Sequence, residues 1–159
     1  MRARRIELTL PVAMAPPAAR ESLARVMQAL AKAGTSPDRF ALAVQLTDLH
    51  AGVAGEVRIP AELRVAERPV HWEYGLSIHA ASGERIFPAF EGALSLTPVG
   101  NAAELWLQGF YTPPFGIIGA LLDRTVFRNV ARRSLDSFLK GIAGEIAADA
   151  KEHYSLRIL

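Results

Sequence analysis

The sequence predicts an α+β domain, in which a curved antiparallel sheet of about six or seven strands wraps around one long carboxy-terminal helix. Apolar and polar residues alternate with period two from Phe40 to Thr112, which is typical of half-buried strands. From Phe115 to about Lys151, apolar residues instead recur every three or four positions, which is typical of a helix. The 159 residues are enough for one core, so residues 1–159 are expected to form a single domain.

The amino-terminal part predicts one strand followed by one helix. Arg2 to Leu10 alternates with period two, which predicts the first strand. From Pro16 to Ala33 the apolar residues follow helical spacing, and Gly34 comes just after the last of them. We therefore expect a helix of about 16 residues here.

The middle of the chain predicts an antiparallel meander, because only short turn-forming clusters separate successive strands. Proline and glycine also fall inside these strands, where they remove a hydrogen-bond donor or a side chain. We expect bends or bulges at Pro60, Pro88, Gly92 and Gly109, and hence a sheet that curls. The expected strands are Phe40–Leu49, Glu56–Glu67, Val70–Ala80, Arg85–Thr97 and Ala103–Thr112, with a turn over Pro98–Asn101.

Two consecutive prolines, Pro113 and Pro114, mark where the last strand ends and the long helix can begin. A helix of some 35 residues is about 50 Å long, more than the width of a small domain. We expect it to fill the concave side of the sheet and either to overhang it or to kink near Gly141 and Gly144. Its expected apolar stripe comprises Leu121, Phe127, Ala131, Leu135, Phe138, Ile142 and Ile146.

Composition and charge exclude several classes of function. The formal charge is only +2 and the basic residues are interleaved with acids, which argues against a nucleic-acid surface. The chain has no cysteine, which excludes disulfides and thiolate chemistry and favours a cytoplasmic location. No transmembrane segment is expected, because the longest apolar runs are far shorter than ~20 residues. His71 and His79 lie ~26 Å apart along a strand, which is too far for both to bind one metal ion, so no metal site is expected. No cofactor is expected either.

The order of these elements is that of the helix-grip fold, and the residues also carry a resemblance. The segments Ala93-Leu94-Ser95-Leu96, Leu105 to Tyr111, Pro113 to Gly116 and Gly119 to Arg124 resemble the SRPBCC superfamily. That group includes polyketide cyclase/dehydrase-like, START-like lipid-transport and birch-pollen-allergen-like proteins. Before Phe40 the resemblance is weaker, because the family often has two short helices where this chain predicts one longer helix.

The resemblance implies a cavity between the concave sheet face and the long helix that accepts a lipid, a polyketide or another aromatic or apolar metabolite. Independently, the face that carries Trp72, Tyr74 and Leu76 is richer in large side chains than a plain core strand needs. Buried tyrosine hydroxyls also need a partner, which a ligand, a water or the backbone supplies. The expected ligand-binding residues are Trp72, Tyr74, Leu76, Phe90, Leu94, Leu107, Tyr111, Leu121, Phe127 and Phe138. The alternative is that these side chains fill a closed core.

An enzyme acting on such a ligand, as a cyclase, dehydratase or hydrolase, is the second hypothesis. A buried Glu91 would have a raised pKa and could act as a general base. The alternation instead places Glu91 on the face opposite Leu94, among solvent-facing residues. The sequence has no nucleophile elbow, phosphate loop or paired metal ligands, so no catalytic residue is assigned.

Two surface features suggest partners. The alternation that buries Leu105 and Leu107 turns Trp106 and Phe110 outward, which suggests a homodimer or another protein partner unless the amino-terminal helix covers them. Arg124, Arg128 and Arg132 follow one edge of the long helix. We expect these arginines to form a solvated face rather than an anion-binding one.

Overall fold

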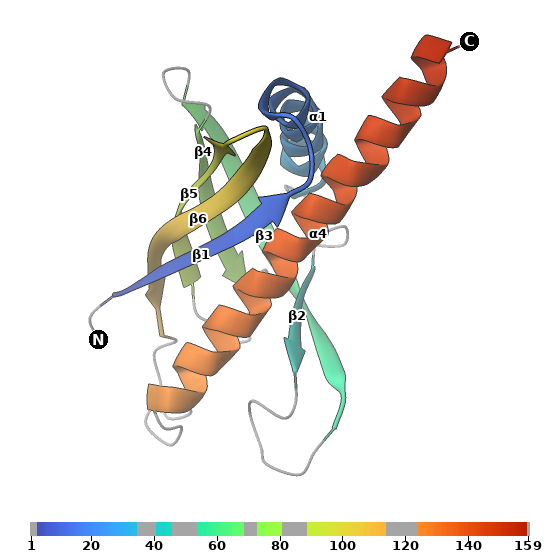
Figure 1. The fold of residues 1–159 in the computed structure, drawn as a ribbon. Helices are drawn as coiled ribbons and strands as arrows, with labels where there is room; N and C mark the ends of the chain where they lie inside the picture. The colour runs from blue at the N-terminus through green and yellow to red at the C-terminus, as the bar shows by residue number, and fades with distance from the viewer. Residues whose placement is uncertain are drawn as a thin grey trace.

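The computed structural model describes residues 3–34, 41–45, 54–68, 73–80, 89–113 and 124–158, and Figure 1 shows a strongly curved sheet crossed by one long helix. Helix α1 follows the first strand, and helix α4 ends the chain. The elements are β1 (Arg4–Val12), α1 (Pro16–Gly34), β2 (Ala41–Gln45), β3 (Glu56–Arg68), β4 (Glu73–Ala80), β5 (Ala89–Val99), β6 (Ala102–Thr112) and α4 (Arg124–Ile158).

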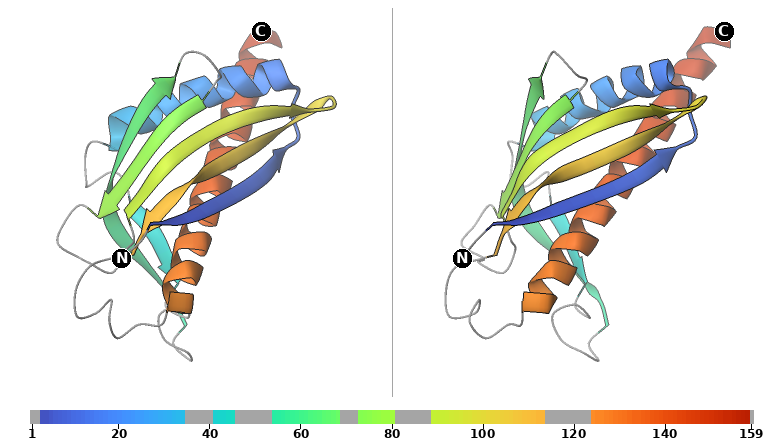
Figure 2. Two further views of the ribbon diagram at one scale, coloured as in Figure 1. Left: turned by 90° about the vertical axis from the view of Figure 1, so that its left-hand side faces the viewer. Right: turned by 60° about the vertical axis from the view of Figure 1, so that its left-hand side comes forward.

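The six strands form one sheet in the order β1-β6-β5-β4-β3-β2, and every described pairing is antiparallel. Strand β3 is long enough to have two partners. Its residues 56–60 pair with β2, and its residues 61–68 pair with β4. Figure 2 shows that α1 and α4 both lie on the same, concave side of the sheet. The predicted α+β helix-grip architecture is therefore confirmed.

Most predicted elements match the structure closely, and the differences lie at strand ends. The predicted turn over Pro98–Asn101 is wrong in length, because β5 continues to Val99 and β6 begins at Ala102. The two intervening residues form the turn, and Gly100 takes a φ of 61°, which favours glycine. Pro98 lies inside β5, where it is opposite Ala103 of β6.

The two strand glycines at which a bend or bulge was predicted pair in a continuous register, so neither forms a bulge, and a close approach accounts for them instead. Gly92 of β5 and Gly109 of β6 lie directly opposite each other. A Cβ atom added to Gly92 would come within 2.3 Å of the backbone oxygen of Gln108 and 2.5 Å of the Phe90 ring. A Cβ added to Gly109 would come within 2.4 Å of the backbone oxygen of Glu91. Glycine is required at both positions, because the two strands and the Phe90 ring leave no room for a side chain.

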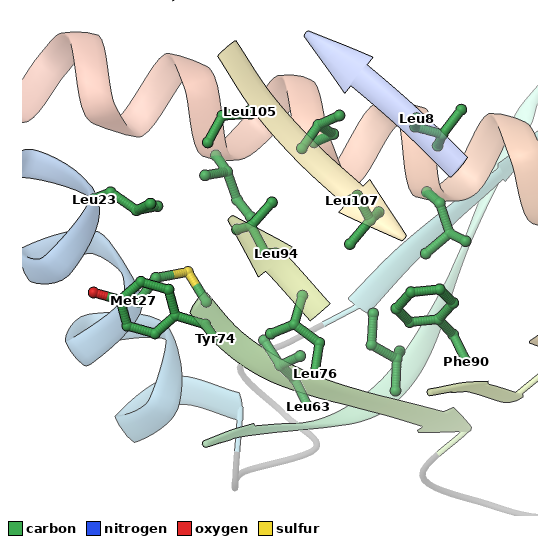
Figure 3. Close-up of a cluster of buried hydrophobic side chains, with 14 of the residues drawn as sticks. Leu8, Leu23, Met27, Leu63, Tyr74, Leu76, Phe90, Leu94, Leu105 and Leu107 are labelled. Carbon is green, nitrogen blue, oxygen red and sulfur yellow. The ribbon is translucent and has the colours of Figure 1, made fainter. Parts of the chain in front are cut away.

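The core lies between the concave sheet face and the two helices, and Figure 3 shows part of it. Strands β1, β3, β4, β5 and β6 contribute alternate residues, as period two predicts. Helix α1 contributes the apolar side of the predicted amphipathic helix. The buried core residues include Ile6, Leu8, Leu23, Met27, Leu63, Tyr74, Leu76, Ile78, Phe90, Leu94, Leu96, Leu105, Leu107, Tyr111, Leu135, Leu139, Ile142 and Ile146.

Helix α4 runs without a break from Arg124 to Ile158, and Figure 1 shows its carboxy-terminal end extending past α1. The predicted overhang is therefore present, whereas the alternative of a kink at Gly141 or Gly144 is wrong. Both glycines face open space, with nothing within 4 Å of an added Cβ. Arg128 and Arg132 are exposed, as predicted for a solvated face. Within the described ranges, neither helix is long and apolar enough to cross a membrane.

Several predicted features lie outside the described residues. They include Val70 to Trp72 at the start of the third predicted strand, Arg85 to Pro88 at the start of the fourth, and the predicted first helical residues from Pro114 to Asp123. Within the described part of the chain, a single helix of 19 residues occupies the position between β1 and β2.

Candidate functional site

A hollow of about 370 Å³ lies between α1 and the adjacent strands β3 and β4. We call it the α1 hollow. On the helix side, Ala24 and Ala31 are two turns apart on the same face, and their small side chains leave space between α1 and the sheet. Its described lining residues are Ala24, Arg25, Met27, Gln28, Ala31, Val65 and Tyr74.

The inner wall of the α1 hollow is part of the core. Met27 is 1% exposed and Tyr74 is 5% exposed. Figure 3 shows the Tyr74 ring beside Met27, with the phenolic oxygen directed toward α1 and away from Phe90. Tyr74 already has an interaction partner in the structure. The α1 hollow therefore combines an apolar floor with a polar rim made by Arg25 and Gln28.

Not all of the predicted ligand-binding residues that the structure describes lie at the α1 hollow. Tyr74 lines the α1 hollow, while Phe138 is partly buried and packs against the core. Leu76, Phe90, Leu94, Leu107 and Tyr111 are all buried on the concave face, and none is among the residues that line the α1 hollow. Trp72, Leu121 and the side chain of Phe127 lie outside the described part of the structure.

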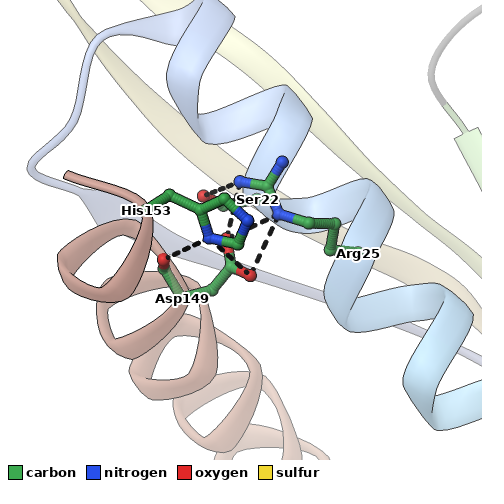
Figure 4. A network of polar contacts seen from close by, with 4 residues as sticks. All are labelled: Ser22, Arg25, Asp149 and His153. Atoms are coloured by element: carbon green, nitrogen blue, oxygen red, sulfur yellow. Dashed lines mark hydrogen bonds and ion pairs between the residues drawn. The ribbon is translucent and has the colours of Figure 1, made fainter. Parts of the chain in front are cut away.

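An ion pair at the rim joins the two helices. Arg25 of α1 donates to Asp149 of α4 from Nε, 3.0 Å from each carboxylate oxygen, and from Nη2, 2.7 Å from Oδ2. Nη2 also lies 3.4 Å from Oγ of the buried Ser22, and Nδ1 of His153 lies 3.0 Å from the backbone oxygen of Asp149 (Figure 4). We call these four residues the α1–α4 clamp.

The clamp shifts the pKa values of both of its charged partners. The hydrogen bond from Arg25 lowers the pKa of Asp149, and partial burial opposes that effect. The hydrogen bond to Asp149 raises the pKa of Arg25. The pair is therefore ionised under ordinary conditions, and it fixes α1, with its share of the α1 hollow, against α4.

The convex face carries a different polar cluster. The Ser77 hydroxyl donates to Oε1 of Glu91 over 2.7 Å, and Nε2 of His79 lies 2.8 Å from that same oxygen and 2.7 Å from Oγ of Ser77. A catalytic triad needs the two ring nitrogens of histidine to face different partners, whereas here a single nitrogen faces both. The side chains of His79 and Glu91 are 48% and 61% exposed, so the predicted solvent-facing position of Glu91 is confirmed and His79 lies beside it at the surface.

A second hollow, of about 480 Å³, lies on the convex face, and we call it the convex hollow. Phe110 borders it and is 53% exposed, as the alternation predicted. Trp106 is partly buried, and its indole N–H has no hydrogen-bond partner in the described structure. Helix α1 lies on the opposite side of the sheet, so the alternative in which it covers these aromatics is wrong. The lining of the convex hollow comprises Arg5, Glu73, Glu91, Gly92, Ala93, Gln108, Gly109 and Phe110.

Among the described residues, no group of three or more histidine, cysteine or acidic side chains could hold a metal ion. In the same ranges, the buried side chains that carry a polar group include those of Ser22, Ser134, Tyr74 and Tyr111, and none of these is a carboxylate or a histidine. The buried carboxylate or histidine that the enzyme hypothesis needs is therefore not found in the part of the concave face that the structure describes.

Sequence reasoning missed the helix side of the α1 hollow. The α1 periodicity predicted Met27 as a core residue, but alanines at 24 and 31 carry no signal that distinguishes a gap from a packed contact. The partner of Arg25 could not be found either, because Asp149 is 124 residues away in the chain. The spacing of Ala24, Gln28 and Ala31 was the one available hint, since it places small and polar residues beside an apolar stripe.

No protein-family model matches the chain, and no curated protein sequence matches it significantly. Solved structures do match. The structure of the Zhui aromatase/cyclase from Streptomyces sp. R1128 aligns with a TM-score of 0.57 at 17% identity, over 92% of this chain and 94% of that one. A conserved protein from Geobacillus kaustophilus aligns with a TM-score of 0.55 at 20% identity, over 91% and 96%. The protein Ara h 8.0201 aligns with a TM-score of 0.51 at 14% identity, over 95% and 99%.

These likenesses cover nearly the whole length of each chain, but the sequence identities are low. They show that the chain has an SRPBCC-type fold, in agreement with the resemblance seen in its sequence. The ligand and the chemistry have to be argued from the side chains of this chain.

Proposed function

We propose that this chain binds and carries a small hydrophobic ligand, such as a lipid, a polyketide or an aromatic metabolite, on the concave side of its sheet. The observation that carries the proposal is the α1 hollow. Its volume of about 370 Å³ falls in the range of small-molecule sites, and its lining is mostly apolar with a few polar groups at the rim. The fold supports the proposal, because one structural match is an aromatase/cyclase by name.

Binding would follow from desolvation. A ligand that enters the α1 hollow removes apolar surface from water against Met27, Val65 and the Tyr74 ring, at roughly 25 cal/mol per Å². The core residues beyond Tyr74, predicted as ligand contacts, would join the site only if the ligand reaches deeper between the sheet and α4. We keep Leu76, Phe90, Leu94, Leu107 and Tyr111 as a proposal for that deeper part.

The test is to measure occupancy directly. Native mass spectrometry of the purified chain is expected to show a retained apolar small molecule, and titration with a fluorescent apolar probe is expected to saturate near one site per chain. If the delipidated protein neither retains a ligand nor shows a saturable site, the proposal is wrong.

The convex face supports a separate proposal about assembly, namely the homodimer expected through Trp106 and Phe110. Phe110 is exposed beside a hollow that holds both a cation, Arg5, and an anion, Glu91, so two copies related by a two-fold axis could pair opposite charges. Light scattering on the wild type and on Phe110→Ser tests this. A dimer that becomes a monomer in the variant is expected, and a monomeric wild type would refute the proposal.

The cytoplasmic location expected from the sequence also stays a prediction. Fractionation of cells that produce the protein under its own promoter would test it, and recovery outside the cytoplasmic fraction would contradict it.

A further inference from the structure

The rim of the α1 hollow carries a charged residue. Among the described lining residues only Arg25 is charged, and Gln28, one helical turn further along α1, is the other polar residue of the rim. The floor beneath them is Met27 and Tyr74, which are buried. A molecule placed in the α1 hollow would therefore have an apolar end against the floor and its other end beside a guanidinium group.

The guanidinium of Arg25 keeps unused donors although it belongs to the α1–α4 clamp. Arginine has five N–H donors, and the contacts to Asp149 and Ser22 use only Nε and Nη2. Nη1 makes no hydrogen bond within the described structure, and Figure 4 shows it pointing away from Asp149. The clamp fixes this free edge in place, so binding an acceptor there costs little further side-chain entropy.

We propose that the α1 hollow selects an amphipathic ligand, whose apolar body lies against Met27 and Tyr74 and whose oxygen-bearing head, a carboxylate or a carbonyl, accepts hydrogen bonds from Arg25 Nη1 and the Gln28 amide. The inference rests on the proposed function and narrows its ligand class. It assigns Arg25 two roles, a structural one through Asp149 and a recognition role through Nη1. Asp149 is thus a positioning residue, because it holds Arg25 without touching the ligand.

Three probes with the same chain length separate head-group recognition from simple apolar binding. Dodecanoate offers an anionic acceptor, 2-dodecanone offers a neutral acceptor, and dodecyltrimethylammonium offers a cation with no acceptor. The wild type is expected to bind dodecanoate about tenfold or more tightly than dodecyltrimethylammonium, with 2-dodecanone between them.

Two variants separate the roles of Arg25. Arg25→Met removes the clamp and the Nη1 donor together, whereas Asp149→Asn weakens the clamp and leaves the guanidinium in place. Arg25→Met is expected to lower the affinity for dodecanoate about tenfold and to keep or raise that for dodecyltrimethylammonium, because it removes a positive charge beside the head group. Asp149→Asn is expected to keep or increase the preference for dodecanoate, because it frees a cation.

The outcomes are distinct. If none of the three probes binds the wild type, both this inference and the proposed function fail. If the probes bind with no preference for an acceptor head, or if Arg25→Met and Asp149→Asn lower dodecanoate affinity equally, the proposed function stands and this inference is wrong.

Discussion

The sheet carries a hollow on each face, and the two hollows differ in their lining rather than mainly in their size. The convex hollow is the larger, at about 480 Å³ against about 370 Å³, but its rim carries Arg5, Glu73 and Glu91, and part of its floor is strand backbone. The α1 hollow has a floor of buried core side chains, and Arg25 is the one charged residue among its described lining residues. Apolar ligands gain free energy from the second kind of surface and little from the first.

The difference follows from the period of two. Adjacent strand residues face opposite sides, so Phe90 enters the core while its neighbour Glu91 joins the convex polar cluster with Ser77 and His79. The side chains that could perform acid–base chemistry therefore lie on the convex face, where water reaches them. The concave face carries apolar side chains, and two helices cover it and exclude water.

The largest expected effect compares two phenylalanines on opposite faces. Phe90 is 1% exposed and its ring covers the Gly92–Gly109 pair, so Phe90→Ala should lower the free energy of unfolding by roughly 3–5 kcal/mol. Phe110→Ala, at an exposed position, should change it by less than about 0.5 kcal/mol. Urea denaturation of both variants checks this, and equal losses would contradict the assignment of the two faces.

The next effect compares two kinds of glycine. Gly92→Ala should destabilise the protein by roughly 2–3 kcal/mol, because the new Cβ would collide with the backbone of β6. Gly144→Ala, on the exposed side of α4, should instead stabilise it by about 0.5–1 kcal/mol. Thermal unfolding of the two variants measures the sign of each change in stability. A stabilised Gly92→Ala would show that the strands do not approach as closely as described.

A smaller effect tests the α1–α4 clamp. Asp149→Asn should cost about 1 kcal/mol at neutral pH, a modest value because both side chains are partly exposed. Since Arg25 lowers the pKa of Asp149 in the folded state, this contribution is present above the ordinary value of 3.8 and is lost as pH falls through the lower folded value. The stability difference between wild type and variant should therefore persist at pH 5 and shrink only below 3.8.

Asp136→Asn serves as the control for the clamp, because Asp136 forms an exposed ion pair with Lys140 one turn along α4. It should change stability by less than about 0.5 kcal/mol. Equal effects of Asp136→Asn and Asp149→Asn would mean that the clamp contributes no more than a surface pair.

The sequence predicted the elements well because their signals are local. The helix from Pro16, the strand from Glu56 and the last strand before Pro113 were each predicted to within one residue, because periodicity and breakers lie within the segment itself. The end of β5 was predicted less well, because Pro98 reads locally as a strand breaker although it pairs with Ala103 of β6 in the structure.

The candidate site was predicted only in part. Tyr74 lines a hollow, but that hollow lies against α1, whereas the cavity was expected between the sheet and the carboxy-terminal helix. The role of Tyr74 in ligand binding stays a prediction. The space beside Ala24 and Ala31 depends on how the helices are arranged. The pairing of Arg25 with Asp149 depends on the same arrangement. Neither has a counterpart in the local pattern of residues.

The central claim is that the α1 hollow is the ligand site, and filling it tests this most directly. The double variant Ala24→Leu/Ala31→Leu places two large side chains in the hollow, while Ala29→Leu places one on the exposed side of the same helix. Leucine is a strong helix former, so α1 itself should persist. With an apolar probe, we expect the double variant to lose at least tenfold in affinity and Ala29→Leu to match the wild type. Unchanged binding in a folded double variant would contradict the account.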